Sequence, residues 1–388
     1  MPWTEVSTMD EKRRFIDAWT SRRFSVAELA EHFQISRKSA YKWIDRFREG
    51  GNSGLQDRSH ARKTQPHRMH EDTEKVLLEL KAKYPRWGPK KIRKKFELVD
   101  GREQAGICVP AASTIGDLFS RHDLVTRRTS KRPHQDMPRA LREATEPNGL
   151  WAIDFKGERP LGDGSMCYPL TVSDDFSRYL LVCHGLQSVE MKGVKPLMER
   201  AFREYGMPAE IRSDCGSPFA HRNAVGGLTR LSVWRLRLGI RLQRTDPGKP
   251  QQNGRHERMH RTLKAATMLP VAASAKPQQA RFDSFRCEYN DERPHEAIDM
   301  CFPSDWYKRS PRAFPDRLPE PDYPKHFLRR QVSSIGNIKL RGNQLFIGAP
   351  LALQHVGLEA TENGWRVYFF STLLAEIDEE TLVVTVLK

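Results

Sequence analysis

The sequence lacks the cysteine pattern of a disulfide-stabilised or cysteine-bound zinc domain. Its six cysteines are scattered and form no Cys-x-x-Cys pair, which argues against both kinds of site. Long apolar runs are also missing. No stretch approaches the roughly 18–20 residues needed to cross a bilayer, and the N-terminus has no apolar core of a signal peptide. We therefore expect a reduced, cytoplasmic protein with no membrane partner.

Acidic residues are outnumbered by basic ones. The 388 residues include 65 Lys and Arg against 49 Asp and Glu, a net charge of +16. This balance favours a polyanionic partner, nucleic acid or a membrane surface, although a basic surface can also be no more than a solvated face. Residues 1–150 carry +10 and residues 151–388 carry +6. With this length and 38% hydrophobic residues, two or three domains with real cores are expected.

Residues 1–50 show three short amphipathic helical patterns. Ser25 and Glu28 are spaced as a capping box, and Ser36 is placed as a second N-cap. Two helices joined by a tight turn predict a helix-turn-helix DNA-binding domain; a plain three-helix bundle with a basic surface is the alternative. The outward side chains suited to phosphates and base edges are Arg37, Lys38, Ser39, Tyr41 and Lys42.

Residues 71–125 read as a second, looser helix-turn-helix-like domain. Pro89 stands where a helix can start, and the helix that follows is rich in Lys, including Lys90 and Lys91, which are further candidates for DNA contact. Ser113-Thr114 is expected to cap the last helix of this domain.

A basic linker over 126–148 precedes a change of pattern. Three consecutive strands, then a helix, a strand, a helix, a strand and a helix predict an α/β core with a mixed sheet over 149–310. Strands return after about residue 330, with Asn363-Gly364 as a hairpin-type turn. We expect a small all-β module over 328–388.

Three acids stand where this core could bring them together. Asp154 lies in the first strand, Asp214 ends the fourth, and Glu257 begins the helix after the loop DPGKPQQNG. Oxygen-only ligands suit Mg²⁺ or Mn²⁺, and two such ions can clamp an in-line phosphoryl displacement. Helical periodicity places Arg261 and Lys264 on the face of Glu257. On the helix alone, a solvated Glu–Arg pair is the simpler interpretation.

Five stretches decide between these interpretations: LWAIDFKG, LTVSDDFSRYL, IRSDCGSPF, PGKPQQNGRHERMHRTLK and YNDERPHEA. In this order they resemble the integrase core of bacterial insertion-sequence transposases, DDE enzymes similar to retroviral integrases and of the RNase H-like fold. The resemblance covers nearly the whole chain, because paired helix-turn-helix units, a catalytic core and a small C-terminal β-barrel are the family's usual order.

The resemblance implies a bacterial, nucleoid-associated DNA transposase. It would bind element-end inverted repeats through residues 1–125 and catalyse metal-dependent strand cleavage and strand transfer, with Mg²⁺ or Mn²⁺ and two ions per active site. Its partners would be double-stranded DNA, at the element ends and the target, and further copies of itself in a dimer or higher assembly. Asp154, Asp214 and Glu257 carry over as the catalytic, metal-binding triad, and Lys264 as the residue that grips the element end.

The sequence departs from the family pattern in two places. Cys215 stands where the family usually carries Asn, and 42 residues separate Asp214 from Glu257, several more than in retroviral integrases. We expect the surplus in a longer helix within 221–239. Neither departure removes a ligand.

Other polar residues near these motifs have structural explanations. Asp174 and Asp175 are expected to pair with Arg178 or to cap a turn. His256 and His260 are expected to pack or to contact DNA, with a role as metal ligands as the alternative. Lys249 and Asn253, before the Glu257 helix, are candidates for backbone contacts. Two other functions stay open: a site-specific DNA-binding regulator with a retired catalytic core, and an RNase H-like nuclease or junction resolvase.

Overall fold

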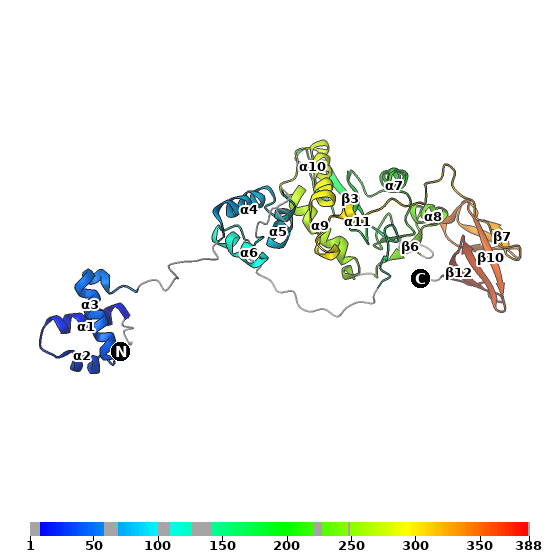
Figure 1. Ribbon diagram of the computed structural model, residues 1–388. Coiled ribbons are helices and arrows are strands. Elements are labelled where there is room, and N and C mark those ends of the chain that lie inside the picture. The colour runs from blue at the N-terminus through cyan, green and yellow to red at the C-terminus, as the bar shows by residue number, and fades with distance from the viewer. Residues whose placement is uncertain are drawn as a thin grey trace. The chain divides into compact units, whose positions relative to one another are not determined.

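The protein is described from a computed structural model (Figure 1). The residues that the structure describes are 8–57, 69–99, 109–125, 141–220, 227–246 and 249–386. Most of the predicted linker at 126–148 therefore lies outside the described residues. The chain divides into two compact units, Met1–His70 and Glu71–Lys388, and each is described by itself. Within the described ranges, no helix is both long and apolar enough to cross a membrane.

The first unit contains three helices, α1 (Thr8–Thr20), α2 (Val26–His32) and α3 (Arg37–Gly54). The predicted capping box is confirmed, since Ser25 and Glu28 each accept a hydrogen bond from the other's backbone N–H. The predicted cap at Ser36 is confirmed as well, because its hydroxyl accepts the N–H of Ser39 at 3.1 Å. The helices enclose a core of Phe15, Ile16, Leu29, Ala30, Ala40, Ile44 and Leu55.

The second unit begins with three more helices, α4 (Glu71–Lys83), α5 (Pro89–Leu98) and α6 (Ala112–Arg121). Pro89 starts α5 as predicted. The predicted cap at Ser113-Thr114 is wrong: the N-cap of α6 is Ala111, two residues before Ser113, and no side chain caps the helix. The apolar residues fully buried in these helices are Leu77, Ile92, Phe96, Ile115, Leu118 and Phe119.

A mixed six-stranded sheet forms the centre of the second unit and confirms the predicted α/β core. Strand β3 pairs antiparallel with β1, β2 and β4, while β1, β5 and β6 run parallel in that order. The strands are β1 (Trp151–Phe155), β2 (Arg159–Pro160), β3 (Met166–Asp174), β4 (Leu180–Leu186), β5 (Glu210–Ser213) and β6 (Arg241–Arg244).

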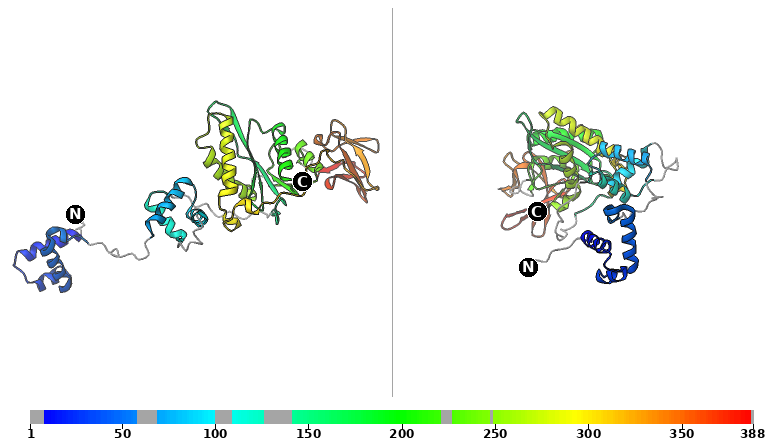
Figure 2. Two further views of the ribbon diagram at one scale, coloured as in Figure 1. Left: turned by 45° about the horizontal axis from the view of Figure 1, so that its top comes forward. Right: turned by 90° about the vertical axis from the view of Figure 1, so that its left-hand side faces the viewer.

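Helices cover both faces of this sheet (Figure 2). Side chains alternate between the faces of a strand, so Leu170 and Val172 point to one face, where they pack with α7 (Met191–Tyr205) and α8 (Arg230–Arg237). On the other face lie α9 (Gly254–Thr267) and α10 (Ala275–Cys287), whose apolar residues pack with Cys167 and Leu180. Helix α8 spans eight residues of the segment 221–239, in which a longer helix was expected, and residues 221–226 lie outside the described residues.

The chain after α10 continues as a π-helix, Glu288–Glu292, and then reaches the short α11 (Pro303–Trp306). The C-terminal module contains a five-stranded antiparallel sheet and a separate hairpin. In the described residues its edge strands, β7 and β13, do not pair with each other, so the predicted closed barrel is not confirmed. The strands are β7 (Leu328–Gln331), β10 (His355–Thr361), β11 (Gly364–Phe369), β12 (Thr372–Asp378) and β13 (Val384–Val386), with the hairpin β8 (Asn337–Leu340) and β9 (Asn343–Phe346).

Candidate active site

Three elements carry the candidate acids to one region of the core. Asp154 lies near the end of β1, Asp214 directly follows β5, and Glu257 is in the first turn of α9. In the parallel pair of β1 and β5, Ala152 is opposite Arg212. Continuing this register by two residues sets Asp154 level with Asp214. The loop after β5 leaves little space beside the carboxylate of Asp214, since a Cβ atom at Gly216 would come 2.9 Å from Oδ2 of Asp214.

The acids act on one another electrostatically. The side chain of Asp154 is 23% exposed, whereas Asp214 and Glu257 are exposed. Burial raises the pKa of Asp154 to about 7, and the negative charge of Asp214, followed by that of Glu257, adds to this effect. The N–H of Phe155, which donates to Oδ1 of Asp154 at 2.8 Å, opposes it. A bound cation would relieve the repulsion among these carboxylates.

The donor chemistry of the triad fits a hard divalent cation, because all of its potential ligand atoms are carboxylate oxygens. Among the residues that the structure describes, no three His, Cys, Asp or Glu side chains are grouped closely enough to hold a metal ion. Holding a metal ion therefore requires the three carboxylates to come closer together than they lie in this structure.

Two histidines of α9 lie beneath the acids, on the sheet. His256 and His260 are each 2% exposed, and the Nε2 atoms of both contact Oγ1 of Thr171, at 2.8 and 2.6 Å. His256 also contacts Oγ of Ser173 through Nδ1, at 2.9 Å. Burial lowers the pKa of both imidazoles, that of His256 to about 3. Of the two expected roles, packing is therefore confirmed.

The acid pair at the end of β3 is structural, as predicted. Asp174 caps a turn, since it accepts the N–H and hydroxyl of Ser177 at 2.8 and 2.6 Å. Asp175 pairs with Arg178 at 3.8 Å. Asp175 also binds Arg255 of α9, and this contact fastens the start of the helix that carries Glu257.

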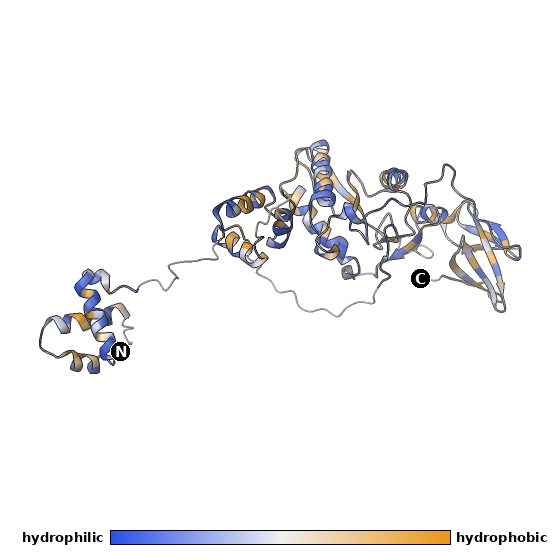
Figure 3. Ribbon diagram, viewed as in Figure 1, coloured by the Kyte–Doolittle hydropathy of each residue, from blue (hydrophilic) through white to orange (hydrophobic). Residues whose placement is uncertain are grey.

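The candidate DNA-contact residues differ in their surroundings. Arg37, Lys38, Tyr41 and Lys42 are exposed on α3, whereas Ser39 is half-buried, with its hydroxyl 2.9 Å from that of Ser36. Lys249 pairs with Asp246 at 3.0 Å, and Asn253 is buried. On α9, which is largely hydrophilic (Figure 3), Arg261 is exposed and Lys264 is half-buried.

Lys90 and Lys91 both contact the segment that follows α10, although Lys90 stays exposed. Lys91 donates to the carbonyl of Pro294, and its burial lowers the pKa of the ammonium group to about 7. Lys90 pairs with Glu296 at 3.1 Å. Two aromatic side chains support this contact, because Trp87 Nε1 donates to Glu288 at 3.0 Å and the hydroxyl of Tyr84 donates to Glu292.

Sequence reasoning missed this contact, which joins α5 and the connection before it to the segment 288–296. The available signal was the spacing of Glu288, Glu292 and Glu296, four residues apart, opposite a helix dense in Lys.

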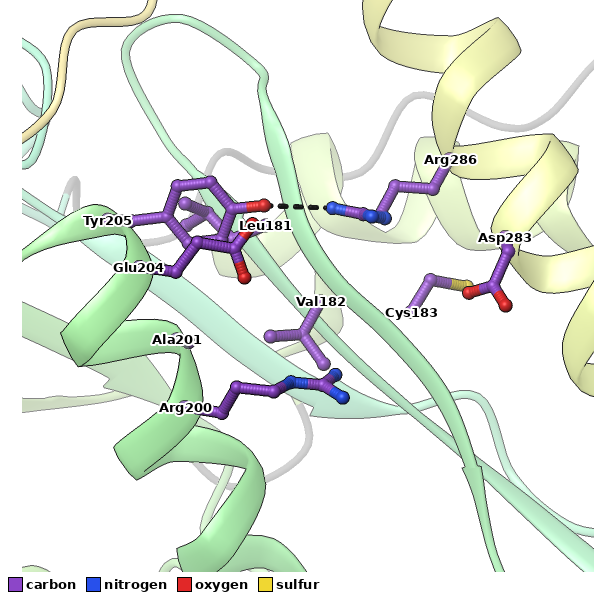
Figure 4. A pocket seen from close by; sticks show the side chains of 9 residues that line it. All are labelled: Leu181, Val182, Cys183, Arg200, Ala201, Glu204, Tyr205, Asp283 and Arg286. Atoms are coloured by element: carbon purple, nitrogen blue, oxygen red, sulfur yellow. Dashed lines mark hydrogen bonds between the residues drawn. The ribbon is translucent and has the colours of Figure 1, made fainter.

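A cavity of about 300 Å³ lies elsewhere in the core, between β4, α7 and α10 (Figure 4). Arg200 and Glu204 line one side and Asp283 and Arg286 the other, and Arg286 donates to the hydroxyl of Tyr205 at 2.9 Å. None of the three candidate acids lines it.

Comparisons with known proteins match the same regions. Residues 144–250 and 238–303 match family models described as an integrase core domain. Residues 11–63 match a helix-turn-helix domain, and residues 39–119 a homeodomain-like domain.

The chain is 29% identical over 197 residues to the insertion element IS407 uncharacterized 31.7 kDa protein of Burkholderia multivorans, which covers 49% of this chain and 66% of that protein. It is 27% identical over 183 residues to the insertion element IS476 uncharacterized 39.2 kDa protein of Xanthomonas euvesicatoria, with 46% and 49% covered. The chain thus spans less than two thirds of either relative.

A solved structure of the HTLV-2 integrase catalytic core domain in complex with magnesium aligns with a TM-score of 0.34 and 13% identity, over 43% of this chain and 100% of that chain. The two integrase-core matches overlap at residues 238–250 and together carry all three acids, and the insertion-element proteins are similar across about half of the chain. Residues 144–303 therefore match the integrase core domain family, and the chain is similar to proteins of two insertion elements.

Proposed function

We propose that the protein is a DNA transposase that binds element-end inverted repeats and catalyses metal-dependent strand cleavage and strand transfer during transposition. The observation that carries this proposal is the electrostatic coupling of Asp154 to Asp214 and Glu257, three carboxylates that come from two adjacent strands and one helix of an integrase core. The helix-turn-helix elements of the same chain supply a means of binding DNA.

In this proposal Asp154, Asp214 and Glu257 hold Mg²⁺ or Mn²⁺, with two ions per site. When bound, such ions neutralise charge on the phosphodiester and activate water for attack. Arg261 and Lys264, which follow Glu257 on α9, contact the DNA backbone and help to place the element end. Lys249 and Asn253 are proposed as further backbone contacts.

The reaction consists of two displacements at phosphorus. In the first, a water oxygen attacks the phosphate that joins the element to its flanking DNA; the bond to the element's 3′ oxygen breaks, and that oxygen leaves as a free 3′-hydroxyl. In the second, this hydroxyl attacks a phosphodiester of the target, so one ester bond forms as another breaks. Catalysis of this kind depends mainly on positioning and charge neutralisation.

We assign the remaining parts of the chain accordingly. Residues 1–50 and 71–125 form the DNA-binding domains, and 126–148 the linker. Residues 149–310 form an RNase H-like catalytic core, and 328–388 a small barrel-like module. The exposed residues of α3 contact the element end. Two element ends must be processed together, so the active form is a dimer or higher assembly on DNA.

The test uses purified full-length protein, terminal fragments of the DNA that encodes it, and Mg²⁺. We expect nicking at the element ends and joining to a target plasmid by the wild type, and loss of both with Asp154→Asn, Asp214→Asn or Glu257→Gln. Asp163→Asn, in an exposed turn, is the matched control. Full activity of the triad variants would contradict the catalytic proposal, and DNA binding with no strand chemistry by the wild type would favour a regulator with a retired core.

A further inference from the structure

A row of polar side chains is buried between β3 and α9 and ends at Asp154. It begins at Ser173, whose Oγ lies 2.9 Å from Nδ1 of His256. From Nε2 of His256 it passes to Oγ1 of Thr171 at 2.8 Å, and from there to Nε2 of His260 at 2.6 Å. The other ring nitrogen of His260, Nδ1, lies 3.7 Å from Oδ2 of Asp154.

The number of hydrogens in this row restricts which of its groups can donate and which can accept. A neutral imidazole carries one N–H and one acceptor nitrogen, and a hydroxyl carries one hydrogen. Thr171 is near three partners: the two Nε2 atoms and the main-chain oxygen of Asp154, which is 3.1 Å from its Oγ1. Its single hydrogen can go either to that oxygen or to one histidine.

The three possible acceptors have two opposite effects on Asp154. If the hydroxyl of Thr171 donates to the main-chain oxygen or to Nε2 of His256, Nε2 of His260 must carry the hydrogen of its own contact with Thr171, and His260 turns the lone pair of Nδ1 toward the carboxylate. If the hydroxyl donates to Nε2 of His260, its shortest contact, then His260 carries its hydrogen on Nδ1 and presents a donor to Asp154. Only the second arrangement attracts an ionised carboxylate, and in it every donor of the row points the same way, which strengthens each bond.

We propose that His260 is a positioning residue for Asp154: the hydrogen bonds from Ser173 through His256 and Thr171 fix its hydrogen on Nδ1 and direct that N–H at Oδ2 of the carboxylate. A shift of about 1 Å converts the contact into a hydrogen bond of ordinary length. The role rests on the proposed function, because it presupposes that Asp154 is a metal ligand. Outer partners of this kind orient ligands, and their loss typically lowers metal affinity about 10- to 100-fold.

Two substitutions of similar size and polarity distinguish the roles of the two ring nitrogens of His260. In His260→Asn the amide nitrogen can take the place of Nδ1 and still donate to Asp154, whereas in His260→Gln it can reach only the place of Nε2. Mn²⁺ binding to the full chain without DNA, measured by calorimetry, should be within about threefold of the wild type for His260→Asn and weakened about 10- to 100-fold for His260→Gln. Equal affinities of the two variants, or wild-type affinity of His260→Gln, would overturn the proposal.

A second measurement is made on the wild type and depends on neither of the two His260 variants. Nitrogen-15 shifts of the histidine rings of the wild type with Mg²⁺ report which nitrogen carries hydrogen, with Thr171→Val used for assignment. We expect hydrogen on Nδ1 of His260, and hydrogen on its Nε2 would overturn the proposal even if both variants failed to fold. A wild type with no saturable Mn²⁺ binding would contradict the proposed metal site itself. If the wild type binds Mn²⁺ normally but His260→Asn and His260→Gln have the same Mn²⁺ affinity, only the role of His260 is contradicted.

Discussion

Nη1 of Arg255 lies 2.8 Å from Oδ2 of Asp175, and the side chain of Asp175 is 2% exposed. Arg255 is two residues before Glu257 on α9, and Asp175 directly follows β3. This ion pair, in which Asp175 is buried and Arg255 is 32% exposed, therefore ties the helix that carries Glu257 to the sheet that carries Asp154. The other guanidinium nitrogen, Nη2, lies 2.7 Å from Glu143, whose side chain is 67% exposed.

The two partners of Arg255 should contribute unequally to stability. Asp175→Asn leaves buried arginines without their counter-charge, and breaking a buried pair typically costs about 3–5 kcal/mol. Glu143→Gln removes a charge from an exposed pair, which is typically worth about 0–1 kcal/mol. Urea unfolding of the core measures both, and equal losses from the two variants would contradict the structural role of Asp175.

The stability of the metal-free protein should fall as the pH rises toward 7. The pKa of Asp154 is about 7 in the folded chain and about 4 in an unfolded one. Between these values the folded state binds more protons, so the penalty is absent below about pH 4 and complete above about pH 7. Asp154→Asn should remove this dependence and be the more stable protein at pH 8. The free energy of unfolding of the wild type and of Asp154→Asn, measured in EDTA at pH 5 and pH 8, tests this expectation. The same change with pH in both proteins would refute it.

Divalent cations should stabilise the wild type and not the triad variants. A ligand that binds only the folded state adds about 2.7 kcal/mol at a concentration 100 times its Kd. We expect Mn²⁺ to raise the thermal midpoint of the wild type and of Asp163→Asn, and to leave Asp154→Asn nearly unchanged. An equal increase of the thermal midpoint in all three proteins would show that the cation binds outside the triad.

The exposed face of α3 should dominate the contribution of the first unit to DNA binding. Lys42 is exposed on α3 and Arg13 is exposed on α1, so their alanine variants change the charge equally. Lys42→Ala should weaken binding to element-end DNA and reduce the salt dependence by about one phosphate contact, whereas Arg13→Ala should have little effect. Fluorescence anisotropy at several salt concentrations distinguishes them; similar losses would indicate only a general effect of charge.

Lys264 should affect DNA placement more than another lysine of the core. Lys264→Ala removes a cation from the face of α9 that carries Glu257, and Lys276→Ala removes one from an exposed position on α10. We expect strand cleavage to fall at least tenfold only in the first variant, about 1.4 kcal/mol of lost interaction. A timed cleavage assay with saturating Mg²⁺ is the measurement, and wild-type rates for Lys264→Ala would exclude the contact.

Local patterns made much of the fold predictable. The caps at Ser25 and Ser36, the start of α5 at Pro89 and the alternating strands of the core depend on interactions within a few residues, which are visible in the sequence. The false cap at Ser113-Thr114 shows the limit of this reasoning, because suitable residue types were present but stood two residues after the actual N-cap, Ala111. The edge strand β7 of the last module and its neighbour β10 were not predicted.

Distant pairings were not predictable in this way. Lys90 and Lys91 had the composition of a DNA-binding helix, yet their partners Glu296 and Pro294 lie more than 200 residues further along the chain. Nothing in a local pattern distinguishes a lysine that faces solvent from one that faces another part of its own chain, since charge and periodicity are the same in both cases.

The sequence by itself determined the identity and order of the three acids, the strands and helix that carry them, and a donor set suited to hard cations. The tertiary structure alone decided what lies beneath them. The rotation of α9 about its axis turns His256 and His260 inward, and the alternation of β3 sets Thr171 and Ser173 opposite them. Such contacts require two elements to meet at one register, and burial then leaves polar groups that only each other can satisfy.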